Sequence, residues 1–127
     1  MRGSSTLPKT ERLQRGSQFR HAYEHGHKIV GKLFVLYVVD HPPDLRTATA
    51  RATRAVGMVT SRKIGDAVTR NRARRLLREA YRLNKQKLNN NLQIVMVART
   101  AINGKKRQDV EAELLRLSRA AGILNET

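Results

Sequence analysis

The 127-residue sequence predicts a single α+β domain, in which a small mixed β-sheet packs against helices. Three apolar runs, at 28–40, 55–61 and 92–98, have the length and the Val, Ile and Leu content of strands. Two further segments, 66–87 and 106–121, repeat apolar residues at the spacing of a helix. A chain of this length can bury one modest core but not two, so we expect one domain.

The predicted domain occupies residues 16–122, between an N-terminal arm of residues 1–15 and a tail of residues 123–127. The arm is polar and basic and lacks the apolar core of a signal peptide, so we expect it to be flexible. The chain has no cysteine, which excludes disulfides and thiolate metal sites, and no apolar run long enough to span a bilayer. These features predict a soluble, cytoplasmic protein.

The first predicted helix begins at Ser17, a good capping residue, and ends before Gly26, with Phe19 and Tyr23 on one face. The strand predicted at 28–40 follows it. The second half of this strand is apolar at consecutive positions, which is typical of a strand that is covered on both faces.

The stretch 41–54 opens with His-Pro-Pro-Asp, and we predict a long, basic hairpin loop that leads into the second strand at 55–61. One helix separates this strand from the third, at 92–98, and that order is typical of a parallel crossover. The segment 106–121 is apolar on one face and is followed by Gly122, which predicts an amphipathic C-terminal helix.

The helix between the second and third strands is the most basic part of the chain, which carries 26 Lys and Arg against 10 Asp and Glu, a net charge of +16. Asp66 is placed to cap its N-terminus. At about 100° per residue, one arc is polar and mostly cationic: Arg70, Asn71, Arg74, Arg78, Arg82 and Lys85. The opposite arc is predicted to face the core: Ala73, Leu76, Leu77, Ala80 and Leu83.

The arginines of the basic arc follow one another every four residues, so like charges are stacked and mildly destabilise the helix. A helix face that is merely exposed to solvent normally mixes charges of both signs. We therefore predict that an anionic partner binds this arc. Arginine makes forked contacts to phosphate and stacks on bases, which points to RNA. A membrane surface is disfavoured because the apolar arc is needed for the core.

This region resembles the signature of the protein subunit of bacterial ribonuclease P. The matching residues are Ile64, Ala67, Arg70, Asn71, Arg72, Ala73, Arg74, Arg75 and Arg78. Four further segments match the family in order and spacing: Phe19 with Tyr23, 34–37, 56–58 and 62–65. The resemblance extends over residues 13–117 and implies the family's fold, which is similar to domain 2 of ribosomal protein S5.

The resemblance implies a subunit of an endoribonuclease that removes the 5′ leader of precursor tRNA. In that family the partner is a catalytic RNA, bound by one protein molecule, and the Mg²⁺ ions that carry out hydrolysis are held mainly by the RNA and the substrate. The chain itself is then expected to contribute no catalytic side chain, no metal site and no organic cofactor. Its histidines have no carboxylate cluster beside them in the sequence and are predicted to be surface residues: His21, His25, His27 and His41.

Two sets of site residues follow from the resemblance. Contacts to the catalytic RNA and to nearby precursor-tRNA phosphates are expected from Arg62, Lys63, Arg70, Asn71, Arg72, Arg74, Arg75 and Arg78. A cleft between the short helix and the sheet is expected to accept the single-stranded leader, with unpaired bases stacking on Phe19, Tyr23 and Tyr37. Core packing is the alternative interpretation, favoured for Phe34 and Val38 and left open for Phe19.

The chain departs from the family pattern at a few points. Arg62 and Arg74 stand where lysine is common, which keeps the charge and changes its geometry. The loop 41–54 is long and carries the extra basic residues Arg46, Arg51 and Arg54; an added RNA contact and simple disorder of the loop both stay open. A ribosomal protein would share the charge but is not expected to combine this signature with an aromatic cleft. A helix-turn-helix DNA-binding protein would need a helix where a strand is predicted.

Overall fold

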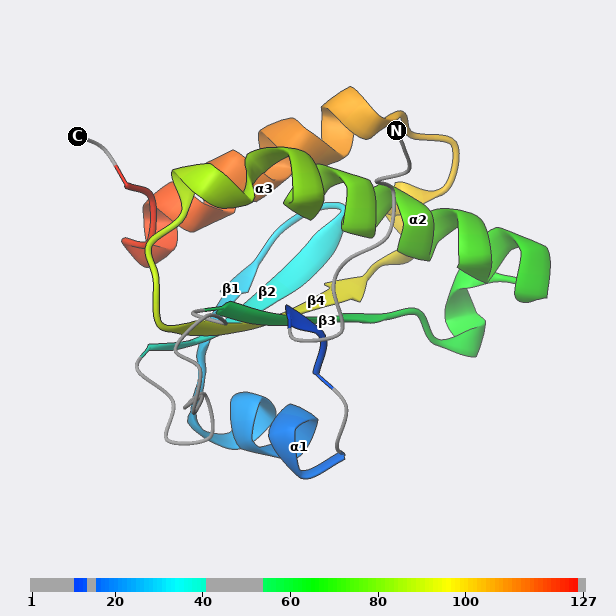
Figure 1. Ribbon diagram of the computed structural model, residues 1–127. Coiled ribbons are helices and arrows are strands. Elements are labelled where there is room, and N and C mark those ends of the chain that lie inside the picture. Colours follow the sequence, from blue (N-terminus) through cyan, green and yellow to red (C-terminus); the bar gives the residue numbers. More distant parts are fainter. Residues whose placement is uncertain (1–10, 14–15, 41–53, 126–127) are drawn as a thin grey trace.

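The structure of the protein, a computed structural model, describes residues 11–13, 16–40 and 54–125. A four-stranded sheet in the order β1-β2-β4-β3 lies between helix α1 on one face and helices α2 and α3 on the other (Figure 1). The strands are β1 (His27–Val30), β2 (Phe34–Asp40), β3 (Arg54–Val59) and β4 (Leu92–Ala98). The helices are α1 (Gly16–His25), α2 (Ala67–Asn84) and α3 (Arg107–Ala121). This arrangement confirms the predicted α+β class.

The single strand predicted directly after the first helix is in fact two strands. β1 and β2 form an antiparallel hairpin in which Val30 pairs with Val35. The chain reverses at Gly31, whose amide donates to the carbonyl of Phe34 at 3.0 Å. A side chain does not fit at this turn, because a Cβ on Gly31 would lie 2.2 Å from Oε2 of Glu113. The apolar content of the run therefore predicted strand, but it did not reveal the turn.

β4 occupies the centre of the sheet, where it pairs antiparallel with β2 and parallel with β3. The predicted parallel crossover from β3 through α2 to β4 is therefore confirmed. The predicted hairpin between β2 and β3 is wrong, because β4 lies between them. β4 suits the central position because six of its seven residues are buried. The predicted loop 41–54 lies outside the described residues, except for Arg54, which begins β3.

The sheet carries a core on each face. On the side of α2 and α3, Phe34 and Val38 belong to the larger core, as predicted. On the side of α1, Val39 and Val95 form a smaller core with Ala22 of the helix. Alternate residues of β2 therefore pack against different helices. This arrangement accounts for the consecutive apolar residues in its sequence.

α2 begins as predicted, because Oδ1 of Asp66 accepts the amide of Thr69 at 2.9 Å. Hydrogen bonds from the side chain and the backbone of Thr69 hold the pKa of the Asp66 carboxyl below its usual value. The core-facing side of the helix differs from the prediction, since Tyr81 is fully buried and Leu83 is 44% exposed. Tyr81 was not among the residues predicted to face the core; its hydroxyl donates to Oε2 of Glu11 at 3.0 Å, so the buried ring keeps a hydrogen-bond partner.

α3 is joined to the β1–β2 turn by a buried carboxylate. Glu113 accepts the amide of Leu33 at 3.1 Å and Nη2 of Arg116 at 2.6 Å. Burial acts to raise the pKa of Glu113, but the hydrogen bonds from Arg116 and the turn outweigh it and the pKa is lowered. The link between helix and turn is thus made by the charged carboxylate. α3 ends as predicted before Gly122, which has φ 75°.

Replacing Glu113 with Gln should lower the free energy of unfolding at pH 7 by about 1–3 kcal/mol, because its charged hydrogen bonds are weakened. The folded-state pKa of Glu113 is the lower one, so its contribution is present above the unfolded value of about 4.3 and is lost as the pH falls through the folded value. Urea unfolding at pH 7 and pH 3 should show a difference between wild type and E113Q that shrinks in acid. A difference independent of pH would contradict this account.

Candidate nucleic-acid interface

The basic residues begin on a tight turn that leads from β3 into α2. This 3₁₀ turn, η2 (Arg62–Ile64), buries Ile64 in the core and leaves its two basic side chains exposed. The carbonyl of Ile64 accepts Nδ2 of Asn103 at 2.8 Å, which ties the turn to the segment after β4. Gly65 follows with φ 147°, a backbone conformation that favours glycine. The start of α2 is thereby fixed against the rest of the fold.

Two arginines in the first turns of α2 are held by neutral acceptors. Nη1 of Arg70 donates to the carbonyl of Gly65 at 2.8 Å. Nη2 of Arg74 donates to Oγ1 of Thr60 at 2.7 Å, and its Nη1 donates to Oδ1 of Asn71 at 3.0 Å. None of these acceptors carries a charge, so both guanidinium groups are positioned without being neutralised. Each also has further N–H donors, since a guanidinium carries five.

The two ends of the predicted basic arc differ in whether carboxylates pair with its basic side chains. Toward the C-terminus of α2, Arg82 pairs with Glu79 at 2.8 Å, and Lys85 pairs with Glu11 at 2.5 Å. The protein's own carboxylates therefore offset this half of the arc. Among the described residues, no carboxylate forms an ion pair with the arginines of the other half, although the Asp66 carboxylate attracts Arg70. We give the name basic face to the residues of this half together with the basic side chains beside them: Arg62, Lys63, Arg70, Asn71, Arg74, Arg75 and Arg78.

One predicted RNA-binding residue, Arg72, lies apart from the basic face. Its Nη2 donates to the carbonyl of Lys105 at 2.8 Å, in the connection that precedes α3. Arg74 reaches the opposite way, toward the end of β3. The structure thus brings Arg70, Asn71 and Arg74 together and directs Arg72 to the other side of α2.

The three predicted leader-binding aromatic residues lie on the α1 side of the sheet. Tyr23 of α1 and Tyr37 of β2 meet edge to face, with ring centroids 4.9 Å apart and an angle of 72° between the planes. Nζ of Lys28 lies 5.9 Å from the centroid of the Tyr37 ring. Phe19 packs over Gly57 of β3, where a Cβ would lie 2.4 Å from its ring. Phe19 therefore packs against the smaller core and stays partly exposed, so both interpretations of it keep support.

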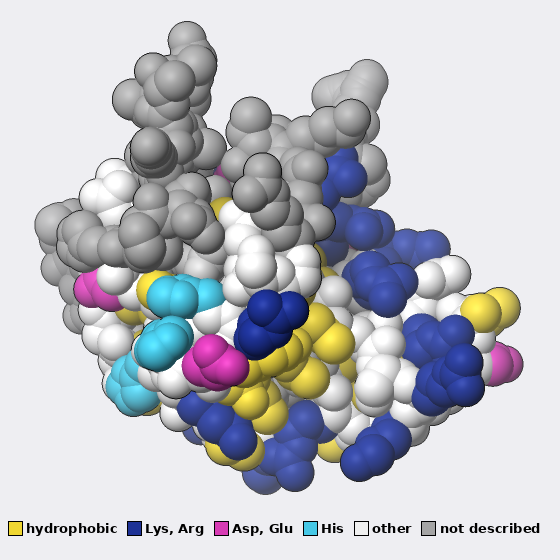
Figure 2. All heavy atoms as spheres, turned by 90° about the horizontal axis from the view of Figure 1, so that it is seen from below, with side chains coloured by type: hydrophobic (Ala, Val, Ile, Leu, Met, Phe, Trp, Pro, Cys, Tyr) yellow, Lys and Arg dark blue, Asp and Glu magenta, His cyan; other side chains and the backbone are white. Residues whose placement is uncertain are grey.

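Two valines that the sequence analysis missed extend this surface. Val59 of β3 and Val97 of β4 are half-buried beside the smaller core. Figure 2 views the molecule from this side and shows apolar surface in the open, bordered by Lys and Arg side chains. We call Phe19, Tyr23, Tyr37, Val59 and Val97 the aromatic face. Side chains alternate between the two faces along a strand, so the sequence could place both valines on this face. It could not show that α1 would leave them partly exposed.

The aromatic face adjoins the basic face. A pocket of about 330 Å³ lies between the η2 turn and the end of β4, and Lys63, Val97 and Arg99 are among the residues that line it. Val97 belongs to the aromatic face and Lys63 to the basic face. A strand of nucleic acid that crosses this pocket would therefore contact apolar and cationic side chains in turn. Arg99 is a further basic residue here that the sequence analysis did not single out.

The described part of the chain has few side-chain groups that could hold a metal ion or catalyse a reaction. The rings of His21 and His25 lie 4.8 Å apart on α1. No three His, Asp or Glu side chains among residues 11–13, 16–40 and 54–125 are grouped so that they could hold a metal ion. No helix within these residues is long and apolar enough to cross a membrane.

A model of the family described as Ribonuclease P matches residues 7–122. The chain belongs to this family. A ribonuclease P protein component from Clostridium botulinum (strain Loch Maree / Type A3) is 34% identical over 118 residues, which cover 92% of this chain and 99% of the relative. Another, from Clostridium perfringens (strain SM101 / Type A), is 36% identical over 113 residues, with coverage of 87% and 88%. The resemblance drawn from the signature is confirmed.

Solved structures of ribonuclease P proteins share the fold. The protein from Staphylococcus aureus matches with a TM-score of 0.72 at 23% identity, covering 91% of this chain and 98% of that one. The protein from Thermotoga maritima matches with a TM-score of 0.71 at 24% identity, covering 87% and 96%. These matches confirm the α+β fold, while similarity to domain 2 of ribosomal protein S5 stays a prediction. Membership of the family associates the chain with a ribonucleoprotein of tRNA processing.

Replacing Gly57 with Ala should displace the Phe19 ring, because the new Cβ would lie 2.4 and 2.6 Å from two of its carbons. Overpacking of this kind lowers stability by about 1–3 kcal/mol. Gly16→Ala is the matched control, since a Cβ there has no atom within 4 Å. Thermal unfolding of both variants and NMR of the Phe19 ring would check this. Two variants of equal stability would contradict the packing of Phe19 on β3.

Proposed function

We propose that the protein is the ribonuclease P subunit that binds the catalytic RNA through the basic face and the single-stranded 5′ leader of precursor tRNA through the aromatic face. One protein per RNA, acting in the cytoplasm, then assists removal of the leader to give the mature 5′ end. The observation that carries the proposal is the placement of Arg70 and Arg74 by neutral acceptors beside an open aromatic surface.

The basic face suits an RNA backbone because its charges are both uncompensated and positioned. Arg74 is held at two points, by Thr60 and by Asn71, so little side-chain freedom is lost when it meets a phosphate. Its remaining N–H groups can donate to two phosphate oxygens at once. An exposed arginine without such anchors would lose more conformational entropy on binding.

The aromatic face suits a leader because stacking on rings tolerates any base. Leaders of different precursor tRNAs differ in sequence, so their shared feature is an unpaired strand. Burial and the neighbouring Tyr37 raise the pKa of Tyr23 above its ordinary value, at which the hydroxyl is already neutral near pH 7. The edge-to-face pair of Tyr23 and Tyr37 also holds the two rings in defined positions.

In this proposal the chain binds and positions RNA, and the Mg²⁺ ions belong mainly to the RNA and the substrate. The described residues offer cations and aromatic rings but no grouped carboxylates that would fit Mg²⁺. Lysine and arginine neutralise phosphates that would otherwise need counterions. The protein should therefore matter most when Mg²⁺ is scarce. A helix-turn-helix mode of DNA binding is not supported, because β3 and η2, not a helix, precede α2.

Replacing Arg74 with Gln should weaken binding to a bacterial ribonuclease P RNA and reduce the slope of log K against log salt concentration by about one. Arg82→Gln is the matched control, because it removes the same charge from the same helix but from a residue already paired with Glu79. Its slope should stay close to that of the wild type. Binding titrations over a series of salt concentrations measure both slopes. The same slope for both variants would remove Arg74 from the RNA contact.

Replacing Tyr37 with Ala should reduce the affinity of the holoenzyme for precursor tRNA by about 1–3 kcal/mol, because a stacking platform is lost. Mature tRNA, which has no leader, should bind as before. Tyr37→Phe keeps the ring and should retain most of the affinity. Equilibrium binding of the two RNAs to each reconstituted holoenzyme tests this. Equal losses for precursor and mature tRNA would show that the substitution acts on folding and not on the leader.

A further inference from the structure

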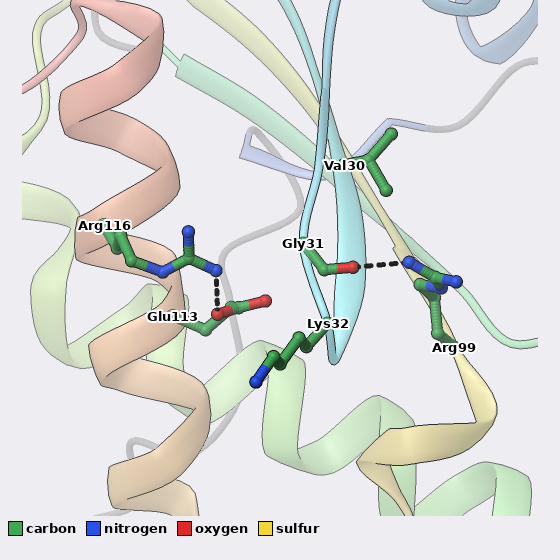
Figure 3. A pocket seen from close by; sticks show the side chains of 6 residues that line it. All are labelled: Val30, Gly31, Lys32, Arg99, Glu113 and Arg116. Atoms are coloured by element: carbon green, nitrogen blue, oxygen red, sulfur yellow. Dashed lines mark hydrogen bonds and ion pairs between the residues drawn. The ribbon is translucent and has the colours of Figure 1, made fainter.

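A second basic pocket lies beside β1, at the sheet edge opposite to the one formed by β3. It has a volume of about 570 Å³ and lies between the β1–β2 turn, the end of β4 and α3 (Figure 3). The side chains and backbone that line it come from these three elements: Val30, Gly31, Lys32, Arg99, Glu113 and Arg116. We call it the α3 pocket.

The two guanidinium groups of the α3 pocket are held in place from opposite sides. Nη1 of Arg99 donates to the carbonyl of Gly31 at 2.7 Å, and Nη2 of Arg116 donates to Oε1 of Glu113 at 2.6 Å (Figure 3). Lys32 is exposed on the turn itself. The turn cannot shift easily, because Gly31 packs tightly against Glu113 and the backbone of β2. The turn and the Arg99 guanidinium are therefore held in place beside the pocket.

The α3 pocket favours an anion. Its lining has three cationic side chains against one carboxylate. That carboxylate, Glu113, is only 8% exposed, and its other oxygen accepts the amide of Leu33. Arg99 donates one hydrogen bond to the neutral carbonyl of Gly31, which leaves further donors on its guanidinium, whereas Arg116 is paired with Glu113. Val30, 58% exposed, adds an apolar wall against which a sugar can pack.

The α3 pocket is continuous with the interface already described. Arg99 lines both this pocket and the smaller one that contains Lys63 of the η2 turn. A polyanion that leaves the basic face at η2 can therefore follow Arg99 around the end of the sheet. It would then reach Lys32.

We propose that the α3 pocket binds a backbone phosphate of RNA, with Lys32 and Arg99 as its contacting cations. This inference rests on the proposed function, because it extends the surface through which the protein holds RNA. The phosphate can belong to the catalytic RNA or to precursor tRNA, which present the same chemistry. In either case it adds contacts at the β1–β2 turn and after β4, outside the ribonuclease P signature of the sequence.

Lys32→Gln and Arg99→Gln test the proposal in the full chain, with Lys87→Gln as the matched control. Lys87 is exposed and lies near the start of β4, whereas the α3 pocket lies at its end, so the control removes the same charge from a distant site. Binding is measured against salt concentration in two arms, first to a bacterial ribonuclease P RNA alone and then of precursor tRNA to the reconstituted holoenzyme. Thermal unfolding shows that each variant is folded.

Each pocket variant should lower the slope of log K against log salt by about one, whereas Lys87→Gln should leave it near the wild-type value. A change in the first arm assigns the phosphate to the catalytic RNA, and a change confined to the second arm assigns it to precursor tRNA. Wild-type slopes for both pocket variants in both arms would overturn the inference while leaving the proposed function intact. Failure of the wild-type protein to bind the catalytic RNA would overturn both.

Discussion

The burial of β4 on both faces is the constraint on which the rest of the structure depends. Its apolar side chains require cover on two sides, and its central position makes β2 and β3 its neighbours. α2 and α3 cover one face, whereas among the described residues the 10-residue α1 and Leu13 cover the other. The apolar surface that α1 leaves open, including Tyr37 and Val97, is the aromatic face. The proposed leader site is thus the uncovered part of a core, and its rings are positioned by the packing that builds the fold.

The parallel pairing of β3 with β4 has a second consequence, because it requires a crossover and the crossover is α2. The helix therefore starts at the end of β3, next to the uncovered face, and its first turns bring Arg70 and Arg74 there. Among the described residues, carboxylates form ion pairs only with the far half of its charge, through Glu79 and Glu11. The near half is held by a hydroxyl, an amide and a carbonyl. These arginines repel one another in the free protein, and a bound anion reduces that repulsion.

Features set by neighbouring residues could be predicted from the sequence, whereas of the features set by distant contacts the parallel crossover from β3 to β4 was predicted and the strand order was not. The strand at 92–98, the Asp66 cap and the helix end before Gly122 are local and were confirmed. Strand order depends on which apolar run is buried on both faces, and the inward turn of Tyr81 depends on Glu11, far away in the sequence. The site residues were predicted through the family resemblance. The α3 pocket was not, because its walls come from three separate segments.

The central claim is that this chain assists an RNA catalyst. The most direct measurement adds the purified protein to a bacterial ribonuclease P RNA at low Mg²⁺ and follows 5′ leader cleavage of a precursor tRNA, with the protein alone as the control. We expect the protein to stimulate leader cleavage only when the RNA is present. Cleavage by the protein alone, or no stimulation of an RNA that is active at high Mg²⁺, would contradict it.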